Sequence, residues 1–145
     1  MKVDQKSVPL KVFIVDDSVL VVNRLRLMFN DCKNIEFAGS ATNISMALTG
    51  IKESMPGVIL LDIHLKDDGP KANGTDLLIL LRKTYPSMLL IMFSNLSTPH
   101  YKQKCMDLGA DYFLDKSNEF DQIPEILNRI YIAASEQSQL NFESL

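Results

Sequence analysis

The stretch VFIVDDSV, residues 12–19, joins a short apolar run to two adjacent carboxylates. A run of this kind is typical of a strand covered on both faces in a parallel sheet. Asp16 and Asp17 carry like charges, so burying them is costly unless a positive charge or a cation lies beside them. The stretch therefore predicts a buried strand that ends at a charged site, where a positive group lies close to the carboxylates.

Short β-like runs and amphipathic helical segments alternate along the chain. The predicted strands are Leu10–Val15, Ile35–Ser40, Val58–Leu61, Met88–Phe93 and Asp111–Leu114. Between and after them, apolar residues recur at helical spacing. This alternation predicts an α/β fold, a doubly wound parallel sheet with right-handed crossovers and helices on both faces.

Capping residues mark where the helical segments begin. Asp17 or Ser18 can cap the first helix and Asn43 the second, and the Ser-Thr-Pro sequence at residues 97–99 opens the fourth. The third, Asp76–Thr84, is apolar nearly all round. We expect that helix to be buried on most of its surface.

Length and composition limit the class of protein. The chain has 145 residues, 46% of them hydrophobic and 23% charged, which is typical of one soluble folded domain. A net charge of −3 without a basic stripe argues against direct binding of nucleic acid. The longest apolar runs are too short to cross a membrane.

The ends of the chain and its cysteines suggest where the protein works. No charged and apolar leader with a cleavage site opens the sequence, so we expect a cytoplasmic location, with Cys32 and Cys105 reduced. We assign residues 1–9 to an N-terminal extension and residues 10–135 to the domain. Residues 136–145, EQSQLNFESL, are polar and weakly patterned, and we expect a frayed extension or the start of a linker.

Polar side chains follow the predicted strands, at the edge where a parallel α/β sheet binds its ligands. Asp62 follows the third strand, Ser94 ends the fourth, and Lys116 follows the fifth, so they join Asp16 and Asp17. Three carboxylates suit a hard cation such as Mg²⁺, and the lysine and hydroxyl suit an anion. An aspartate among these groups is suited to accept a phosphoryl group. Taken singly, each residue is explained as well by a helix cap, a turn or a surface charge.

The motifs VDDS, LLD, FS and DK, in this order and at this spacing, resemble the receiver domain of two-component response regulators. The resemblance extends over residues 10–135. It implies a flavodoxin-like (βα)5 fold with strand order 2-1-3-4-5. It also implies that Asp62 is the phospho-acceptor, that Asp17 and Asp62 bind Mg²⁺ directly, and that Asp16 acts through a metal-bound water.

The resemblance implies further roles and partners. The backbone carbonyl of His64 would be another Mg²⁺ ligand, Ser94 and Lys116 would contact the phosphoryl group, and Phe113 would be the switch aromatic. A histidine kinase or histidine phosphotransfer protein would donate the phosphoryl group, and the protein would catalyse only its own phosphorylation and dephosphorylation. The signal would leave through the face made by the fourth helix, fifth strand and fifth helix, toward a protein partner. Homodimer formation stays open.

The sequence departs from the family pattern in three places. The loop Ile63–Asn73 is longer than usual and has Lys66 where proline is common, so we expect an extra turn there. Ser117 replaces the proline that usually follows the lysine, and we expect a trans bond between Lys116 and Ser117, since a cis bond without proline costs about 3 kcal/mol. Asn95 stands where a small residue is typical, and we expect its bulk to narrow the approach to the acceptor.

The sequence leaves three alternative functions open. The chain could be the receiver of a longer DNA-binding transcriptional regulator, because DKSNEFDQIPEIL resembles the end of receivers that precede helix-turn-helix domains. A Mg²⁺-dependent phosphatase with an aspartyl nucleophile needs a second acid two residues after the first, and Ser18 and His64 stand there instead. A receiver-like fold that never accepts phosphate is disfavoured by the complete set of acids, hydroxyl and lysine.

Overall fold

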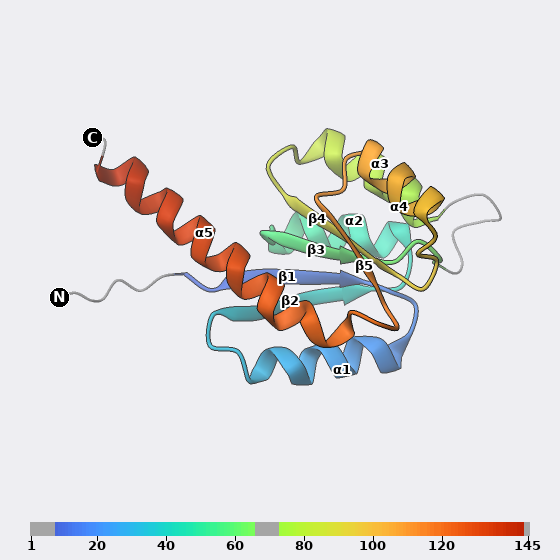
Figure 1. The fold of residues 1–145 in the computed structure, drawn as a ribbon, viewed down its shortest axis with the longest axis horizontal. Helices are drawn as coiled ribbons and strands as arrows, with labels where there is room; N and C mark the ends of the chain where they lie inside the picture. Colours follow the sequence, from blue (N-terminus) through green and yellow to red (C-terminus); the bar gives the residue numbers. More distant parts are fainter. Residues whose placement is uncertain (1–7, 66–72, 144–145) are drawn as a thin grey trace.

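Five parallel strands form one sheet in the order β2-β1-β3-β4-β5 (Figure 1). The computed structural model describes residues 8–65 and 73–143. The strands are β1 Leu10–Val15, β2 Ile35–Ala41, β3 Val58–Leu61, β4 Leu89–Ser94 and β5 Tyr112–Asp115. The helices are α1 Val19–Asn30, α2 Ile44–Ser54, α3 Gly74–Thr84, α4 Pro99–Asp107 and α5 Ile123–Glu143, with a short 3-10 turn, Phe120–Gln122, before α5. This topology confirms the doubly wound α/β fold and its strand order.

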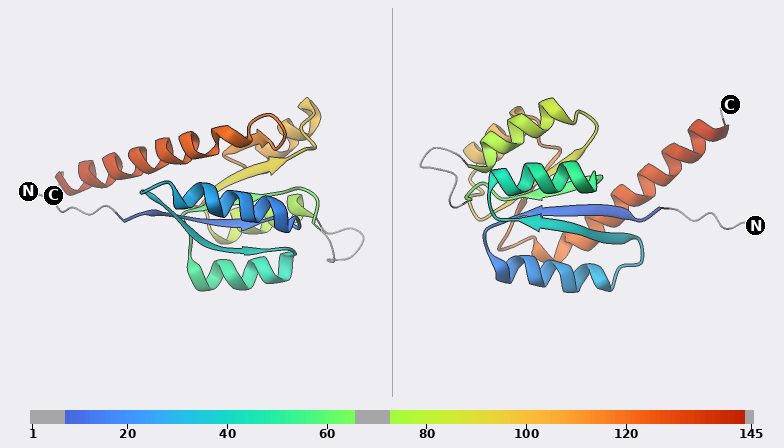
Figure 2. Two further views of the ribbon diagram at one scale, coloured as in Figure 1. Left: turned by 90° about the horizontal axis from the view of Figure 1, so that it is seen from below. Right: turned by 180° about the vertical axis from the view of Figure 1, so that it is seen from behind.

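Helices cover both faces of the sheet (Figure 2). On one face, buried side chains of α1 and α5 pack on the sheet, among them Leu25, Phe29 and Leu127. On the other, α2, α3 and α4 contribute residues such as Ile51 and Leu81. The four residues of β3 are all buried, which explains why its sequence is a continuous apolar run.

The register of the central strands decides which polar residues become neighbours. Val15 of β1 pairs with Leu61 of β3, so the next residue of each strand, Asp16 and Asp62, leaves the sheet at the same level. Ser94 of β4 pairs with Asp115 of β5, one residue before Lys116. Consequently the residues expected at the strand ends lie at one edge of the sheet.

The pairing of β2 with β1 has one irregularity in register, and a glycine explains it. The register shifts between Val12 and Phe13, and Gly39 opposite has a φ of +144°. A Cβ on Gly39 would lie 3.0 Å from the Phe13 ring, closer than side chains normally approach. Glycine therefore supplies both the backbone conformation and the space for the ring.

The structure corrects several expected boundaries. Strands β4 and β5 each begin and end one residue later than predicted. Just before β5, the Asp111 carboxylate accepts from Leu90 N–H at 2.9 Å while Asp111 N–H donates to the Leu90 carbonyl at 2.8 Å. Strand β2 extends to Ala41. Ser18, not Asp17, caps α1, and its hydroxyl accepts from Val21 N–H at 3.2 Å.

Two helices also differ from expectation. Helix α3 buries Leu77, Leu78 and Leu81 but leaves Ile79 46% and Leu80 40% exposed, so it has an open face. Helix α5 continues to Glu143, where we expected a frayed extension or a linker. Its C-terminal part projects beyond the amino ends of the strands (Figures 1 and 2). The part of the chain that the structure describes contains no helix long and apolar enough to cross a membrane.

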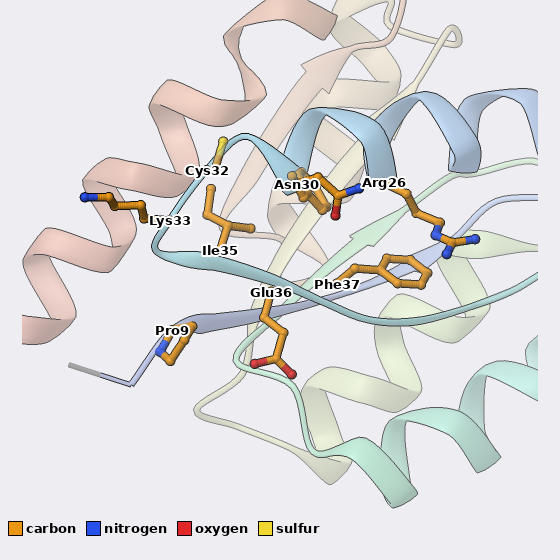
Figure 3. Close-up of a pocket in the computed structure, with 9 residues that line it drawn as sticks. Pro9, Arg26, Asn30, Cys32, Lys33, Ile35, Glu36 and Phe37 are labelled. Carbon is orange, nitrogen blue, oxygen red and sulfur yellow. The ribbon is translucent and has the colours of Figure 1, made fainter. Parts of the chain in front are cut away.

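A half-open pocket of about 540 Å³ lies at the end of the sheet opposite the expected site, near the amino ends of β1 and β2 (Figure 3). It lies between the end of α1 and the start of β2, where the Arg26 guanidinium stacks 4.9 Å from the centre of the Phe37 ring. Cys32, at its rim, donates its thiol to the Met28 carbonyl. Cys32 and Cys105 are both free cysteines, and burial raises the pKa of each thiol.

Candidate functional site

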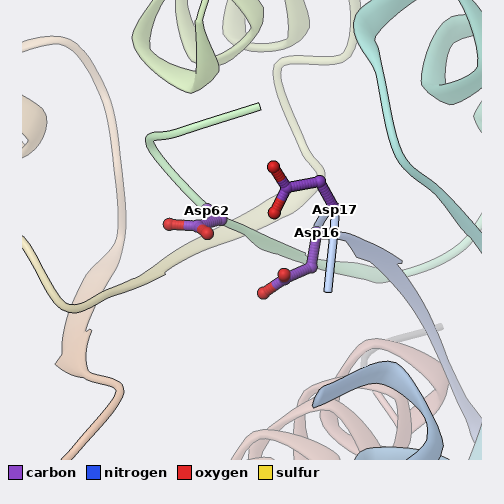
Figure 4. A group of neighbouring side chains, drawn as sticks. All are labelled: Asp16, Asp17 and Asp62. Carbon is purple, nitrogen blue, oxygen red and sulfur yellow. The ribbon is translucent and has the colours of Figure 1, made fainter. Parts of the chain in front are cut away.

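Three carboxylates meet at the carboxyl ends of β1 and β3. One oxygen each from Asp16, Asp17 and Asp62 lies within 4.8 Å of the other two (Figure 4). Asp16 is 2% exposed and Asp62 is 7% exposed, whereas Asp17 is half-buried. Burial removes water from carboxylates that also repel one another, so their charged forms need a positive group or a cation nearby, as the VDDS motif predicts.

The end of β5 supplies the positive charge. The Nζ atom of Lys116 lies 2.7 Å from Oδ2 of Asp16 and 2.9 Å from Oδ2 of Asp62, and the lysine side chain is only 11% exposed. The ammonium thus bridges two of the three acids. The four groups together keep a net negative charge, so the site retains the capacity to bind a cation.

The bonds of the two bridged acids are not equivalent. Asp16 uses both oxygens, because Oδ1 accepts from Ser18 N–H at 2.9 Å while Oδ2 accepts from Lys116. Asp62 accepts from Lys116 through Oδ2, and within residues 8–65 and 73–143 no group donates to its Oδ1. Oδ1 of Asp62 is therefore the carboxylate oxygen of this pair that the described residues leave without a donor.

Burial and pairing shift the pKa of two members of the site. Burial raises the pKa of Asp16 above its ordinary value, although the bonds from Lys116 and Ser18 oppose the shift. For Lys116, burial alone would lower the pKa, but the hydrogen bonds and charges of Asp16 and Asp62 together outweigh it and raise the pKa. The lysine therefore stays an ammonium at neutral pH.

Ser94 and Phe113 lie on the strands beside the acids. Ser94 is fully buried, and its hydroxyl oxygen accepts from Leu96 N–H at 3.1 Å. Its carbonyl accepts from Lys116 N–H at 3.0 Å, which holds the residues carrying the hydroxyl and the ammonium side by side. Phe113 is half-buried and packs against the core under α2, α3 and α4, together with Tyr101.

Gly74, the first residue of α3, touches the backbone of Asp62. An added Cβ would lie 1.9 Å from the Asp62 carbonyl oxygen, and Gly74 N–H donates to the Ile63 carbonyl at 2.6 Å. A capping box between Asn73 and Asp76 fixes this helix start. The sequence offered a signal that our prediction did not use, since a glycine directly after an Asn cap indicates a close approach.

The departures from the family pattern have different outcomes. The Lys116–Ser117 bond is trans, as predicted, since no cis peptide occurs among the described residues. Asn95 accepts a 2.7 Å hydrogen bond from the Ser117 hydroxyl, a contact that the sequence did not indicate. Lys66 and most of the long loop lie outside the described residues. His64 is exposed, and a metal-binding role for its carbonyl stays a prediction.

The acids fit a hard cation in number, type and spacing. Mg²⁺ prefers carboxylate oxygens at about 2.1 Å, so two of its ligands lie at most about 4.2 Å apart. Oxygens within 4.8 Å of one another need only small side-chain rotations to reach that geometry.

The family model for the response regulator receiver domain matches residues 12–128. The chain belongs to this family. The receiver is 31% identical to a protein-glutamate methylesterase/protein-glutamine glutaminase of Clostridium acetobutylicum, over 91% of this chain and 39% of that protein. It is 27% identical to the transcriptional regulatory protein MctR of Rhizobium johnstonii, over 83% of this chain and 55% of that protein. It thus spans well under two thirds of both relatives.

A solved structure agrees with the sequence comparison. The response regulator domain of Thermotoga maritima CheB superposes with a TM-score of 0.72 at 26% identity, over 87% of this chain and 96% of that one. Receiver domains act in two-component signalling, bind Mg²⁺ at an acidic pocket, and interact with histidine kinases or phosphotransfer proteins. The predicted family and its fold are therefore confirmed.

Proposed function

We propose that this receiver is a phosphorylation-controlled switch in which Asp62 accepts the phosphoryl group. The observation that carries this proposal is the difference between the two acids bridged by Lys116. Both oxygens of Asp16 accept a hydrogen bond, whereas Asp62 is held by Lys116 through Oδ2 and its Oδ1 accepts none from the described residues. A nucleophilic oxygen needs room for the approaching phosphorus as well as a neutralised environment, and Oδ1 of Asp62, to which no described group donates, combines the two beside Lys116.

These contacts support the following route for phosphoryl transfer to Asp62. Oδ1 of Asp62 forms a bond to phosphorus while the P–N bond to the donor histidine breaks, and the imidazole keeps the electron pair and takes up a proton. Asp16, Asp17 and Asp62 would hold Mg²⁺, which supplies neutralisation of charge on the transferring oxygens. Lys116 stays charged, so its ammonium can turn from Oδ2 of Asp62 to a phosphoryl oxygen.

The response would begin at Ser94. An aspartyl phosphate adds charge and acceptor oxygens, to which the buried Ser94 hydroxyl can donate after leaving its bond with Leu96. Phe113 pairs with Met92, two residues before Ser94 on β4, and we expect its ring to move into the space that the hydroxyl vacates. We expect the face of α4, β5 and α5, which includes Tyr112 at 40% exposure, to change shape and recruit a protein partner.

Mass spectrometry of the intact chain tests the proposal. Incubation with acetyl phosphate and Mg²⁺ should add one phosphoryl group to the wild-type protein and none to Asp62→Asn, which keeps the shape but removes the nucleophile. Asp107→Asn is the matched control, because Asp107 lies at the far end of α4. Equal labelling of Asp62→Asn would refute the assignment, and turnover of a generic phosphomonoester would favour the phosphatase alternative instead.

A second candidate concerns how the switch acts. The match to MctR, a transcriptional regulatory protein, over 55% of that protein favours a receiver that controls a regulator of transcription. In that case the recruited surface would act on another part of the same polypeptide. The reading frame of the gene decides between this candidate and a separate protein partner.

A further inference from the structure

One hydrogen bond joins the loops that follow β4 and β5, directly after Ser94 and Lys116, and both of its side chains are exposed. The pairing of the two strands ends with Ser94 and Asp115, and Lys116 N–H then donates to the Ser94 carbonyl at 3.0 Å. The Ser117 hydroxyl donates to Oδ1 of Asn95 at 2.7 Å, so this bond joins the next residue of each loop. A side-chain bond thus prolongs the ladder past the ends of the strands.

Each partner of this bond is adjacent to a group that would face the phosphoryl oxygens. Asn95 follows Ser94, and Ser117 follows Lys116. Neighbouring Cα atoms are about 3.8 Å apart, so a fixed separation of Asn95 and Ser117 also limits the separation of the two residues before them.

Ser117 makes two bonds that a proline at this position would not make. Its N–H donates to Oδ1 of Asp115 at 3.2 Å, and its hydroxyl donates to Asn95. Proline has no N–H and restricts the chain through its ring instead. Here the chain after Lys116 is held by two hydrogen bonds, one of which crosses to the neighbouring loop.

We propose that the Asn95–Ser117 hydrogen bond is a clasp that positions the Ser94 hydroxyl and the Lys116 ammonium as a pair for phosphoryl transfer to Asp62. Asn95 and Ser117 are positioning residues, since they act through their neighbours. The inference rests on the proposed function of Asp62. Because phosphoryl transfer depends on positioning and charge, loosening the pair should slow the reaction.

Two nearly isosteric variants of the full chain test the clasp. Ser117→Thr keeps the hydroxyl, and Ser117→Val has the same shape without it. The rate of phosphorylation by acetyl phosphate at saturating Mg²⁺ should fall about fivefold in Ser117→Val, which corresponds to about 1 kcal/mol, and should stay near the wild-type rate in Ser117→Thr. Mg²⁺ affinity, measured by calorimetry, should be equal in both, because the acids lie on other strands.

The partner side of the bond gives a second measurement. Asn95→Leu keeps the bulk of the side chain but removes the acceptor, so it should slow the reaction by a similar factor. The double variant with Ser117→Val should be no slower than the slower single variant, since both remove the same bond.

The outcomes separate the two proposals. If wild-type protein is labelled on Asp62 while Ser117→Val reacts as fast as Ser117→Thr, the clasp is refuted and the acceptor assignment stands. Additive effects of Asn95→Leu and Ser117→Val would also refute the clasp. If the wild-type protein takes no phosphoryl group on Asp62, the proposed function fails, and the clasp fails with it.

Discussion

Replacing Gly74 by alanine should disturb the acceptor through its backbone. The new Cβ would lie 1.9 Å from the Asp62 carbonyl oxygen and 2.8 Å from the Ile63 Cα. Ordinary contact begins near 3.4 Å, so helix α3 and the end of β3 must separate by about 1.5 Å. Both groups are backbone, and no side-chain rotation relieves the clash.

The cost has two parts. Overpacking a tight contact costs about 1–3 kcal/mol. The separation also weakens the 2.6 Å bond from Gly74 N–H to the Ile63 carbonyl, worth about 1 kcal/mol. A total of about 2–4 kcal/mol corresponds to a melting temperature lower by about 7–13 °C for a chain of this length. Because Asp62 itself moves, phosphorylation by acetyl phosphate should slow as well.

Gly57→Ala is the matched control. Its Cβ would meet the Leu10 side chain at 3.3 Å, and the end of a leucine can give way. Thermal melts of the three proteins without Mg²⁺, and their phosphorylation rates with it, measure the difference. If Gly74→Ala melted within 1 °C of the control and reacted at its rate, the close approach of α3 to the acceptor would be refuted.

Two further predictions concern the acids. Asp17→Ala should weaken Mg²⁺ binding by about tenfold or more. It should also raise the melting temperature without Mg²⁺, because it removes repulsion among the three carboxylates while Ser18 keeps the helix cap. Unchanged Mg²⁺ affinity in calorimetry would exclude Asp17 as a ligand. Burial raises the pKa of Asp16 above 3.8, so wild-type stability relative to Asp16→Asn should be greatest below pH 3.8 and decline as the pH rises through the folded-state pKa. Urea unfolding of both proteins from acid to neutral pH measures this trend, and a relative stability that increased with pH would contradict it.

The features that the sequence predicted well depend on local pattern. The continuous apolar runs before Asp16 and Asp62 indicated strands covered on both faces, and the parallel arrangement then placed their polar ends at one edge. The identity of the α1 cap was ambiguous because Asp17 and Ser18 both suit that position. Helix α5 continues into the segment for which we expected a frayed extension or a linker, because the polar residues after Ala134 include no glycine or proline that would stop a helix.

The features that were missed depend on register between distant segments. The hydrogen bond between Asn95 and Ser117 exists because β4 and β5 pair with Ser94 opposite Asp115, and several registers fit the same apolar pattern. The two-sided bonding of Asp16 also requires Lys116, which lies 100 residues further along the chain. Composition and spacing show that such groups share an edge, but not which atoms meet.

The long separation between Lys116 and the acids has a consequence for synthesis. The two ion pairs close loops of 54 and 100 residues, and the ammonium comes from the strand at the edge of the sheet. On the ribosome, β1 and β3 emerge before β5, so the carboxylates are present before their counter-charge exists. We expect a nascent receiver that ends before Lys116 to be unresponsive to a phosphodonor. The protein then becomes able to signal only after its last strand has been synthesised and has joined the sheet.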